Sequence, residues 1–115
     1  MEQAHPSHDE YLSQRRKEAV ILAKEMLESD EALIVKCRIM HGILRALESE
    51  RLEEPRLTFW GIDSETDHLP LTVSPELLDS DYRQRILEEA RQSAAFFRFE
   101  IHRACRQVLE RYRDA

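Results

Sequence analysis

Asp63, Glu65 and Asp67 place carboxylates at alternate positions of one short stretch, as the first ligands of a calcium-binding loop are placed. The twelve-residue EF-hand loop also needs Gly at its sixth position and Glu at its twelfth. His68 and Ser74 stand at those two positions, so the pattern fails. We therefore expect no metal site, and interpret the carboxylates either as a loop that braces its own backbone or as a surface for a partner.

The same stretch holds the residue types of a nucleophilic triad, in Ser64, Asp67 and His68. Nothing around Ser64 resembles a nucleophile elbow or the glycines of an oxyanion hole. The five histidines are scattered, without the H-E-x-x-H spacing or the cysteine partner of a zinc site. We therefore predict that the chain is not an enzyme, with no catalytic residue and no cofactor. A metal-dependent or enzymatic role for the Asp63–His68 stretch is the least favoured hypothesis.

The net charge of −6 is concentrated in one part of the chain. Between Leu57 and Tyr82 there are six acidic residues and no lysine or arginine, whereas the remaining 17 acidic residues balance all 17 basic ones. The six are Asp63, Glu65, Asp67, Glu76, Asp79 and Asp81. A localised negative field of this kind suits a basic protein partner and repels nucleic acid.

The elements that must carry these residues are helices. A chain of 115 residues is long enough for one domain with one core. It contains only two glycines and four prolines, so turns are few and the elements between them are long. We predict a single all-α domain over residues 1–115.

The helix boundaries follow from capping residues and from the spacing of apolar residues. Ser7 and Glu10 have the spacing of a capping box, which predicts a helix start at residue 8. The 4-3-4-3 spacing of apolar residues from Leu33 to Leu47 predicts a central helix, and Pro55 is expected to end it. We expect three main helices over about residues 8–28, 31–53 and 81–112, a short helix near 75–79 and a long structured loop over 55–74.

The last helix carries two phenylalanines on the side opposite its apolar face. At 100° per residue, Phe96 and Phe99 fall among charged residues rather than among core positions. Two interpretations stay open. Trp60, Phe59 or Leu71 from the preceding loop could cover the two rings, which we favour slightly. Otherwise the rings form an exposed contact surface, for a second copy or for another protein.

Cysteine usage and the N-terminus bear on where the protein works. Cys37 and Cys105 both fall on apolar helix faces, which predicts buried free thiols in a reducing compartment. Met1–Pro6 lacks the basic and apolar regions of a secretory signal, and no apolar run approaches the ~20 residues needed to cross a bilayer. We expect a cytoplasmic protein that does not bind membranes.

Three stretches of the chain carry a resemblance to a known kind of protein. They are Cys37–His41 (CRIMH), Phe59–Pro70 (FWGIDSETDHLP) and Ala104–Arg106 (ACR). Together they resemble small helical bacterial proteins of the domain-of-unknown-function type, some of which are immunity proteins to antibacterial toxins. The resemblance covers most of the chain and brings no catalytic residues with it. What it implies is an interaction protein.

The leading functional hypothesis is therefore a protein-binding inhibitor, most specifically an immunity protein that covers the active or substrate-binding site of a toxin. The partner would be a protein with a basic cleft, because the candidate surface is acidic. The expected partner-binding residues are Trp60, Asp63, Glu65, Asp67, His68, Asp79, Asp81, Phe96 and Phe99. The alternative is a homo-oligomeric structural or regulatory module, in which the last helix pairs with its copy to form a homodimer.

Overall fold

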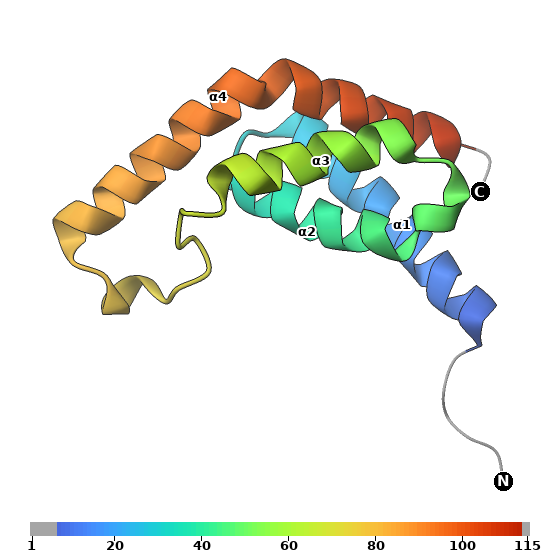
Figure 1. Ribbon diagram of the computed structural model, residues 1–115, viewed down its shortest axis with the longest axis horizontal. Helices are drawn as coiled ribbons and strands as arrows, with labels where there is room; N and C mark the ends of the chain where they lie inside the picture. Colours follow the sequence, from blue (N-terminus) through green and yellow to red (C-terminus); the bar gives the residue numbers. More distant parts are fainter. Residues whose placement is uncertain (1–6, 114–115) are drawn as a thin grey trace, which may run out of the picture.

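The computed structural model describes residues 7–113 and builds them into four α-helices and two short 3₁₀ helices (Figure 1). The N-terminal segment Met1–Pro6, on which the prediction of no secretory signal rests, lies outside the described residues. No strand occurs within residues 7–113, so the all-α prediction is confirmed. In chain order the elements are α1 (His8–Glu28), α2 (Leu33–Ala46), η1 (Glu48–Glu50), α3 (Glu53–Thr66), η2 (Pro75–Leu77) and α4 (Ser80–Arg111).

The first helix begins and ends where the sequence predicts. The Ser7 hydroxyl accepts a hydrogen bond from the Glu10 backbone N–H at 3.1 Å, and the Glu10 carboxylate accepts one from the Ser7 N–H at 2.9 Å. This reciprocal pair satisfies two of the backbone donors that the first turn of a helix leaves free. The capping-box prediction is therefore confirmed.

The predicted second helix, residues 31–53, is wrong at its C-terminal end. The helix α2 ends at Ala46, and the chain continues through the 3₁₀ turn η1. Arg51 then adopts a left-handed backbone conformation, with φ of 64°. Such a residue ends the 3₁₀ turn and redirects the chain into α3, which begins at Glu53. The helix α2 thus ends well before Pro55, which belongs to the next helix.

The predicted loop over residues 55–74 is also wrong, because its first part is the helix α3. Pro55 is the third residue of this helix, where a missing N–H costs nothing since the first turn has no partner for it. Gly61 lies inside the helix and is tolerated there at a modest cost. The buried residues of α3 recur every three or four positions, as a helix requires: Pro55, Phe59, Ile62 and Thr66.

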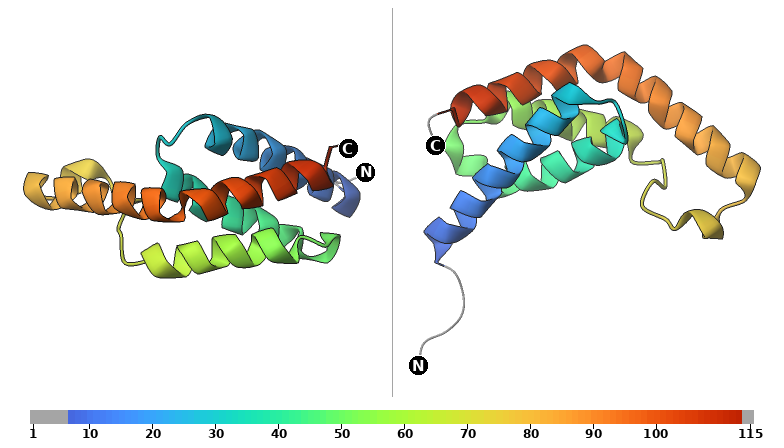
Figure 2. Two further views of the ribbon diagram at one scale, coloured as in Figure 1. Left: turned by 90° about the horizontal axis from the view of Figure 1, so that it is seen from above. Right: turned by 180° about the vertical axis from the view of Figure 1, so that it is seen from behind.

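The four helices form a bundle in which α1 and α3 lie on opposite sides of α4 (Figure 2). Each of these two helices packs against both α2 and α4, so α2 occupies the central position predicted for it. The core between them is filled by fully buried side chains from all four helices, with Met26, Met40, Phe59 and Ile101 among the largest. The bundle thus has two long faces beside α4, one shared with α1 and one with α3.

The last helix is longer than its neighbours and arches over them with its concave side toward the core (Figure 1). Its N-terminal half extends beyond α2 and α3, and the connection from Asp67 to Asp79 lies beneath it. Leu69 in this connection is buried and Leu71 packs against the core. The connection therefore covers part of the overhang, and the short helix expected near 75–79 is η2.

Candidate protein-interaction surface

The helix α3 distributes the predicted acidic loop over two sides. Residues four apart share one side of a helix, whereas a residue two positions away points elsewhere. Asp63 and Asp67 therefore lie on the α2 side, where the Asp63 carboxylate is 3.7 Å from the Arg38 guanidinium. Glu65 lies on the other side, toward α4. Asp63 is half-buried and paired, so Glu65 and Asp67 are the members of this group exposed to a partner.

His68 and the two later acidic residues occupy separate places. The His68 ring nitrogen Nε2 lies 2.6 Å from a carboxylate oxygen of Glu89 on α4, and both side chains are exposed. Asp79 caps α4, because its carboxylate accepts hydrogen bonds from the N–H groups of Asp81 and Tyr82 at 3.2 and 3.4 Å. Asp79 and Asp81 thus stand at the far corner of the molecule, away from α3. The acidic segment is continuous in sequence but is divided in space.

Two contacts between α3 and α4 fix how these helices lie against each other. Arg103 donates a hydrogen bond to the Glu54 carboxylate at 3.0 Å, and His68 contacts Glu89. The residue numbers fall along one helix as they rise along the other, so the two helices are antiparallel. Phe96 lies seven positions from both Glu89 and Arg103, and therefore on the same side of α4.

The residue of α3 that stands opposite Phe96 in this register is Gly61. Glycine has no side chain to cover a neighbouring ring, and a Cβ placed on Gly61 would meet nothing within 4 Å. Phe96 is 78% exposed and Phe99 is 71% exposed, because both project from the side of α4 opposite its buried residues. The favoured expectation that Trp60, Phe59 or Leu71 covers these rings is wrong. Phe59 is fully buried in the core instead, and Trp60 is itself exposed.

We call the outer surface formed by Leu57, Gly61, Glu65, Phe96 and Phe99 the α3–α4 face. Leu57 belongs to it because it precedes Gly61 by four positions and is 62% exposed. Two phenylalanines and a leucine exposed on the outer sides of two neighbouring helices are uncommon on a protein that acts alone. The α3–α4 face therefore has the apolar centre and acidic edge of a protein contact surface.

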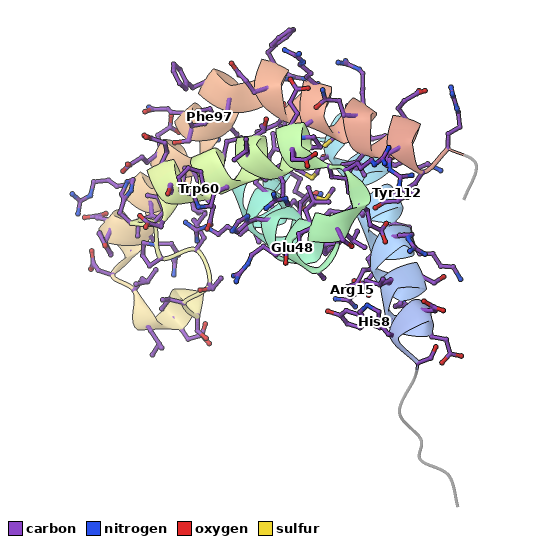
Figure 3. All side chains as sticks on the ribbon, turned by 45° about the vertical axis from the view of Figure 1, so that its right-hand side comes forward. His8, Arg15, Glu48, Trp60, Phe97 and Tyr112 are labelled. Carbon is purple, nitrogen blue, oxygen red and sulfur yellow. The ribbon has the colours of Figure 1, made fainter. Side chains whose placement is uncertain are left out.

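Trp60 lies beside this face, on the side of α3 that turns toward α2 (Figure 3). It lines a shallow hollow of about 460 Å³ together with Leu57, His41 and Arg45. An exposed tryptophan next to a hollow is a frequent anchor in protein interfaces. The structure therefore brings Trp60 close to Leu57 and leaves the Phe96 and Phe99 rings on the α4 side of the same helix.

A buried polar cluster escaped the sequence analysis. Glu50 is only 9% exposed, and its carboxylate accepts two hydrogen bonds from Arg16 that are 2.9 and 2.7 Å long. It also accepts one at 2.8 Å from the hydroxyl of Tyr112, which lies where the end of α4 meets α1 (Figure 3). The Arg111 guanidinium donates to the Glu50 backbone carbonyl at 2.9 Å. This cluster joins η1 to α1 and to the C-terminal end of α4.

The protonation states in this cluster are set by its hydrogen bonds. The hydrogen bond from Arg16 holds the pKa of the Glu50 carboxyl below its usual range, despite the opposing effect of burial. Burial, together with the neighbouring carboxylate, raises the pKa of the Tyr112 hydroxyl, which stays a donor at neutral pH. Glu50 thus remains charged and fully paired. We assign it a structural role, since its carboxylate is occupied by Arg16 and Tyr112.

The two cysteines are buried free thiols, as predicted. Burial raises the pKa of Cys37 well above its usual range and that of Cys105 to about 12. The Cys105 sulfur lies 4.0 Å from that of Met26 in the same core. Because a thiol reacts as its thiolate, neither cysteine is a nucleophile in the folded protein.

Other site types were sought among residues 7–113. This part of the chain holds no group of three or more histidine, cysteine or acidic residues placed to bind a metal ion. None of the helices of the described chain combines the length and the apolar character needed to cross a membrane. No known protein family matches the sequence, and no similar curated protein or solved structure was found.

Proposed function

We propose that this protein is a protein-binding inhibitor that docks its α3–α4 face onto a basic cleft of a partner protein. The observation that carries the proposal is the exposure of Phe96 and Phe99, whose rings are 78% and 71% exposed on the outer side of α4. Exposing two aromatic rings costs free energy in the isolated chain, and a partner that buries them would recover it. Aromatic side chains are also the residues that most often dominate binding energy.

Charge supports the choice of a basic partner. Glu65 and Asp67 are exposed and form no ion pair within residues 7–113. An unpaired carboxylate beside an apolar surface is available for a lysine or arginine of the partner. It would speed association and fix the orientation of docking more than it would add affinity. The α3–α4 face then supplies the anchors, and these carboxylates supply the steering.

The resemblance to immunity proteins gives the proposal its most specific form. An immunity protein neutralises a toxin by occupying the active or substrate-binding site, which is basic in toxins that act on anionic substrates. A rigid helical surface with aromatic anchors would suit such a plug, because little conformational entropy is lost on binding. The inhibition would be stoichiometric and would need no chemistry from this chain.

The test is capture of a partner from the native host by four immobilised forms of the chain. They are the wild type, Phe96→Asp, Phe99→Asp and the control Ile39→Asp, which alters another exposed apolar side chain, on α2. We expect the wild type and Ile39→Asp to retain the same partner and both phenylalanine variants to lose it. The captured protein should also regain an enzymatic or toxic activity when released. A partner retained equally by all four forms, or a chain recovered alone, would contradict the proposal.

The exposed rings also favour a second candidate, a homodimer formed by two α4 helices. Phe96 and Phe99 are adjacent on α4, so a two-fold contact would bring the four rings of two copies together. Sedimentation measures this directly. A two-fold dimer should reach twice the 13.6 kDa mass of the chain, and Phe96→Asp should return it to the monomer. A plateau at the dimer mass that survives Phe96→Asp would exclude this candidate.

A further inference from the structure

A second candidate surface lies on the opposite side of α4 from the α3–α4 face. Between α1 and the C-terminal end of α4 runs a groove of about 890 Å³, the larger part of it apolar. It lies on the side shown from behind in Figure 2. Its apolar floor is formed by Val20, Ile21, Leu109 and the ring of Tyr112. Ile21 is 59% exposed there, so an apolar ligand side chain can reach it.

The rim of the groove is strongly basic, although the protein as a whole is acidic. Five basic side chains line it, and the single acidic residue, Glu110, is already paired with Arg113 at 2.8 Å. Arg16 is held by Glu50, but Lys17, Lys24 and Arg106 form no ion pair within the described chain. Two of the three lysines of the sequence therefore stand beside this one groove. Its complement must present apolar side chains flanked by carboxylates.

The described chain exposes one element with that chemistry, which we call the acidic corner, residues 73–82. Leu77 in η2 is 75% exposed, more than any other exposed large aliphatic residue of the described chain. Three carboxylates and no base accompany it, in Glu76, Asp79 and Asp81. Tyr82 closes the corner and is covered on one side by the Arg85 guanidinium, 5.5 Å from its ring centre. Leu77 and Glu76 are therefore the side chains that project freely.

The acidic corner and the groove lie at opposite ends of α4 (Figure 1). Between Ser80 and Arg106 the helix rises about 1.5 Å per residue, so roughly 40 Å separate them. A rigid helix cannot bring its own two ends together. The acidic corner of one molecule therefore cannot reach its own groove. A corner that enters the groove must come from a second molecule.

We infer that the groove between α1 and α4 is a docking site for the acidic corner of a second copy of this chain. Leu77 enters between Val20, Ile21 and Leu109, while Glu76 and Asp81 face the lysines and arginines of the rim. The interface joins two different surfaces, so each added copy leaves one groove and one corner open. Association is therefore head-to-tail. The contact between the acidic corner and the groove uses neither Phe96 nor Phe99, so its test is independent of the proposed inhibitor role.

The test uses two variants, each defective in one of the two surfaces. Glu76→Gln/Leu77→Ser removes the projecting groups of the corner and spares Asp79, which caps α4. Ile21→Ser/Lys24→Gln alters the groove at two exposed positions and spares the Arg16–Glu50 pair. The matched control is Lys36→Gln/Ile39→Ser on α2, which makes the same kind of change outside both surfaces. Circular dichroism checks that all three remain helical.

Sedimentation equilibrium supplies the readout, at protein concentrations up to about 1 mM so that a contact with a Kd of that size would be half formed. The average mass of the wild type and of the control should rise with concentration beyond twice 13.6 kDa, and should fall back at about 1 M salt. Each variant alone should remain monomeric. An equimolar mixture of the two should form a dimer, because one intact corner and one intact groove are then present.

Four results would overturn the inference. A wild type that stays at 13.6 kDa at every concentration shows that the groove has another occupant, or none. A mass that reaches a plateau at the dimer indicates a two-fold contact instead. Variants that associate as the wild type does, or fail to associate with each other when mixed, place the contact elsewhere. Loss of association in Phe96→Asp alone would assign it to the α3–α4 face.

Discussion

Replacing Phe59 with alanine is expected to lower the free energy of unfolding by about 3–5 kcal/mol. The ring is fully buried and is among the largest side chains of the core. It anchors α3 to the bundle, so its removal would leave a cavity that the short helix cannot easily close. Chemical denaturation followed by circular dichroism measures the loss.

The neighbouring aromatic residue provides the control. Trp60 is larger than Phe59 but 57% exposed, so Trp60→Ala should cost less than about 1 kcal/mol. The difference in stability loss between Phe59→Ala and Trp60→Ala reports which side of α3 faces the core. If residues 55–66 formed a loop that folded over the Phe96 and Phe99 rings, both substitutions would have comparable effects. Equal losses would therefore contradict the helix and its register.

The difficulty of predicting α3 from sequence has a physical cause. Apolar residues at helical spacing run from Leu52 through Pro55 and Phe59 to Ile62. This stretch therefore contains a proline, and it also contains Gly61. Both residues are usually helix breakers. Pro55 is harmless because it falls in the first turn, a fact that depends on where the preceding helix stops. The helix α2 stops at Ala46, and the turn that follows it ends at Arg51 in a left-handed conformation for which arginine gives no sequence signal.

The starts of α1 and α4 were predictable because their signals are local. The Ser7 capping box and the Asp79 cap lie next to the residues whose backbone they satisfy. The candidate surface depends on pairs distant in sequence, which composition cannot reveal. Gly61 stands opposite Phe96 in the register given by the contact between Glu54 and Arg103, so α3 offers no side chain there to cover the ring. The sequence left open whether the Phe96 and Phe99 rings are covered or exposed. Tertiary packing leaves both exposed.

The concentration of charge was likewise visible in the sequence, but its arrangement was not. Asp63 is partly neutralised by Arg38, and Asp79 is used as a helix cap. Asp63 pairs with an arginine outside the acidic segment, whereas Asp79 accepts hydrogen bonds from backbone N–H groups within it. The acidic residues left for a partner then fall into two groups, near Glu65 and near Glu76. The two groups face the two different contacts that we propose.

Replacing Glu50 with glutamine is expected to lower the free energy of unfolding at pH 7 by about 2–3 kcal/mol. Within residues 7–113, the carboxylate is the only side chain that accepts hydrogen bonds from the Arg16 guanidinium and the Tyr112 hydroxyl. A neutral amide offers one oxygen where the two donors now share two. Arg16 is partly exposed and can turn to water, which keeps the loss below that of a fully buried pair. Glu48→Gln in the same 3₁₀ helix is exposed and should change stability by less than about 0.5 kcal/mol.

The pH dependence of this effect has a definite sign. The pKa of Glu50 is lower in the folded protein than the value of about 4.3 expected for an unfolded chain, so the unfolded state binds the proton more tightly. The stabilisation is fully present above pH ~4.3 and is lost as the pH falls through the lower folded pKa. The stability difference between wild type and Glu50→Gln should therefore shrink in acid. A difference that stayed constant from pH 7 to about pH 3.5 would show that Glu50 acts through packing rather than through its charge.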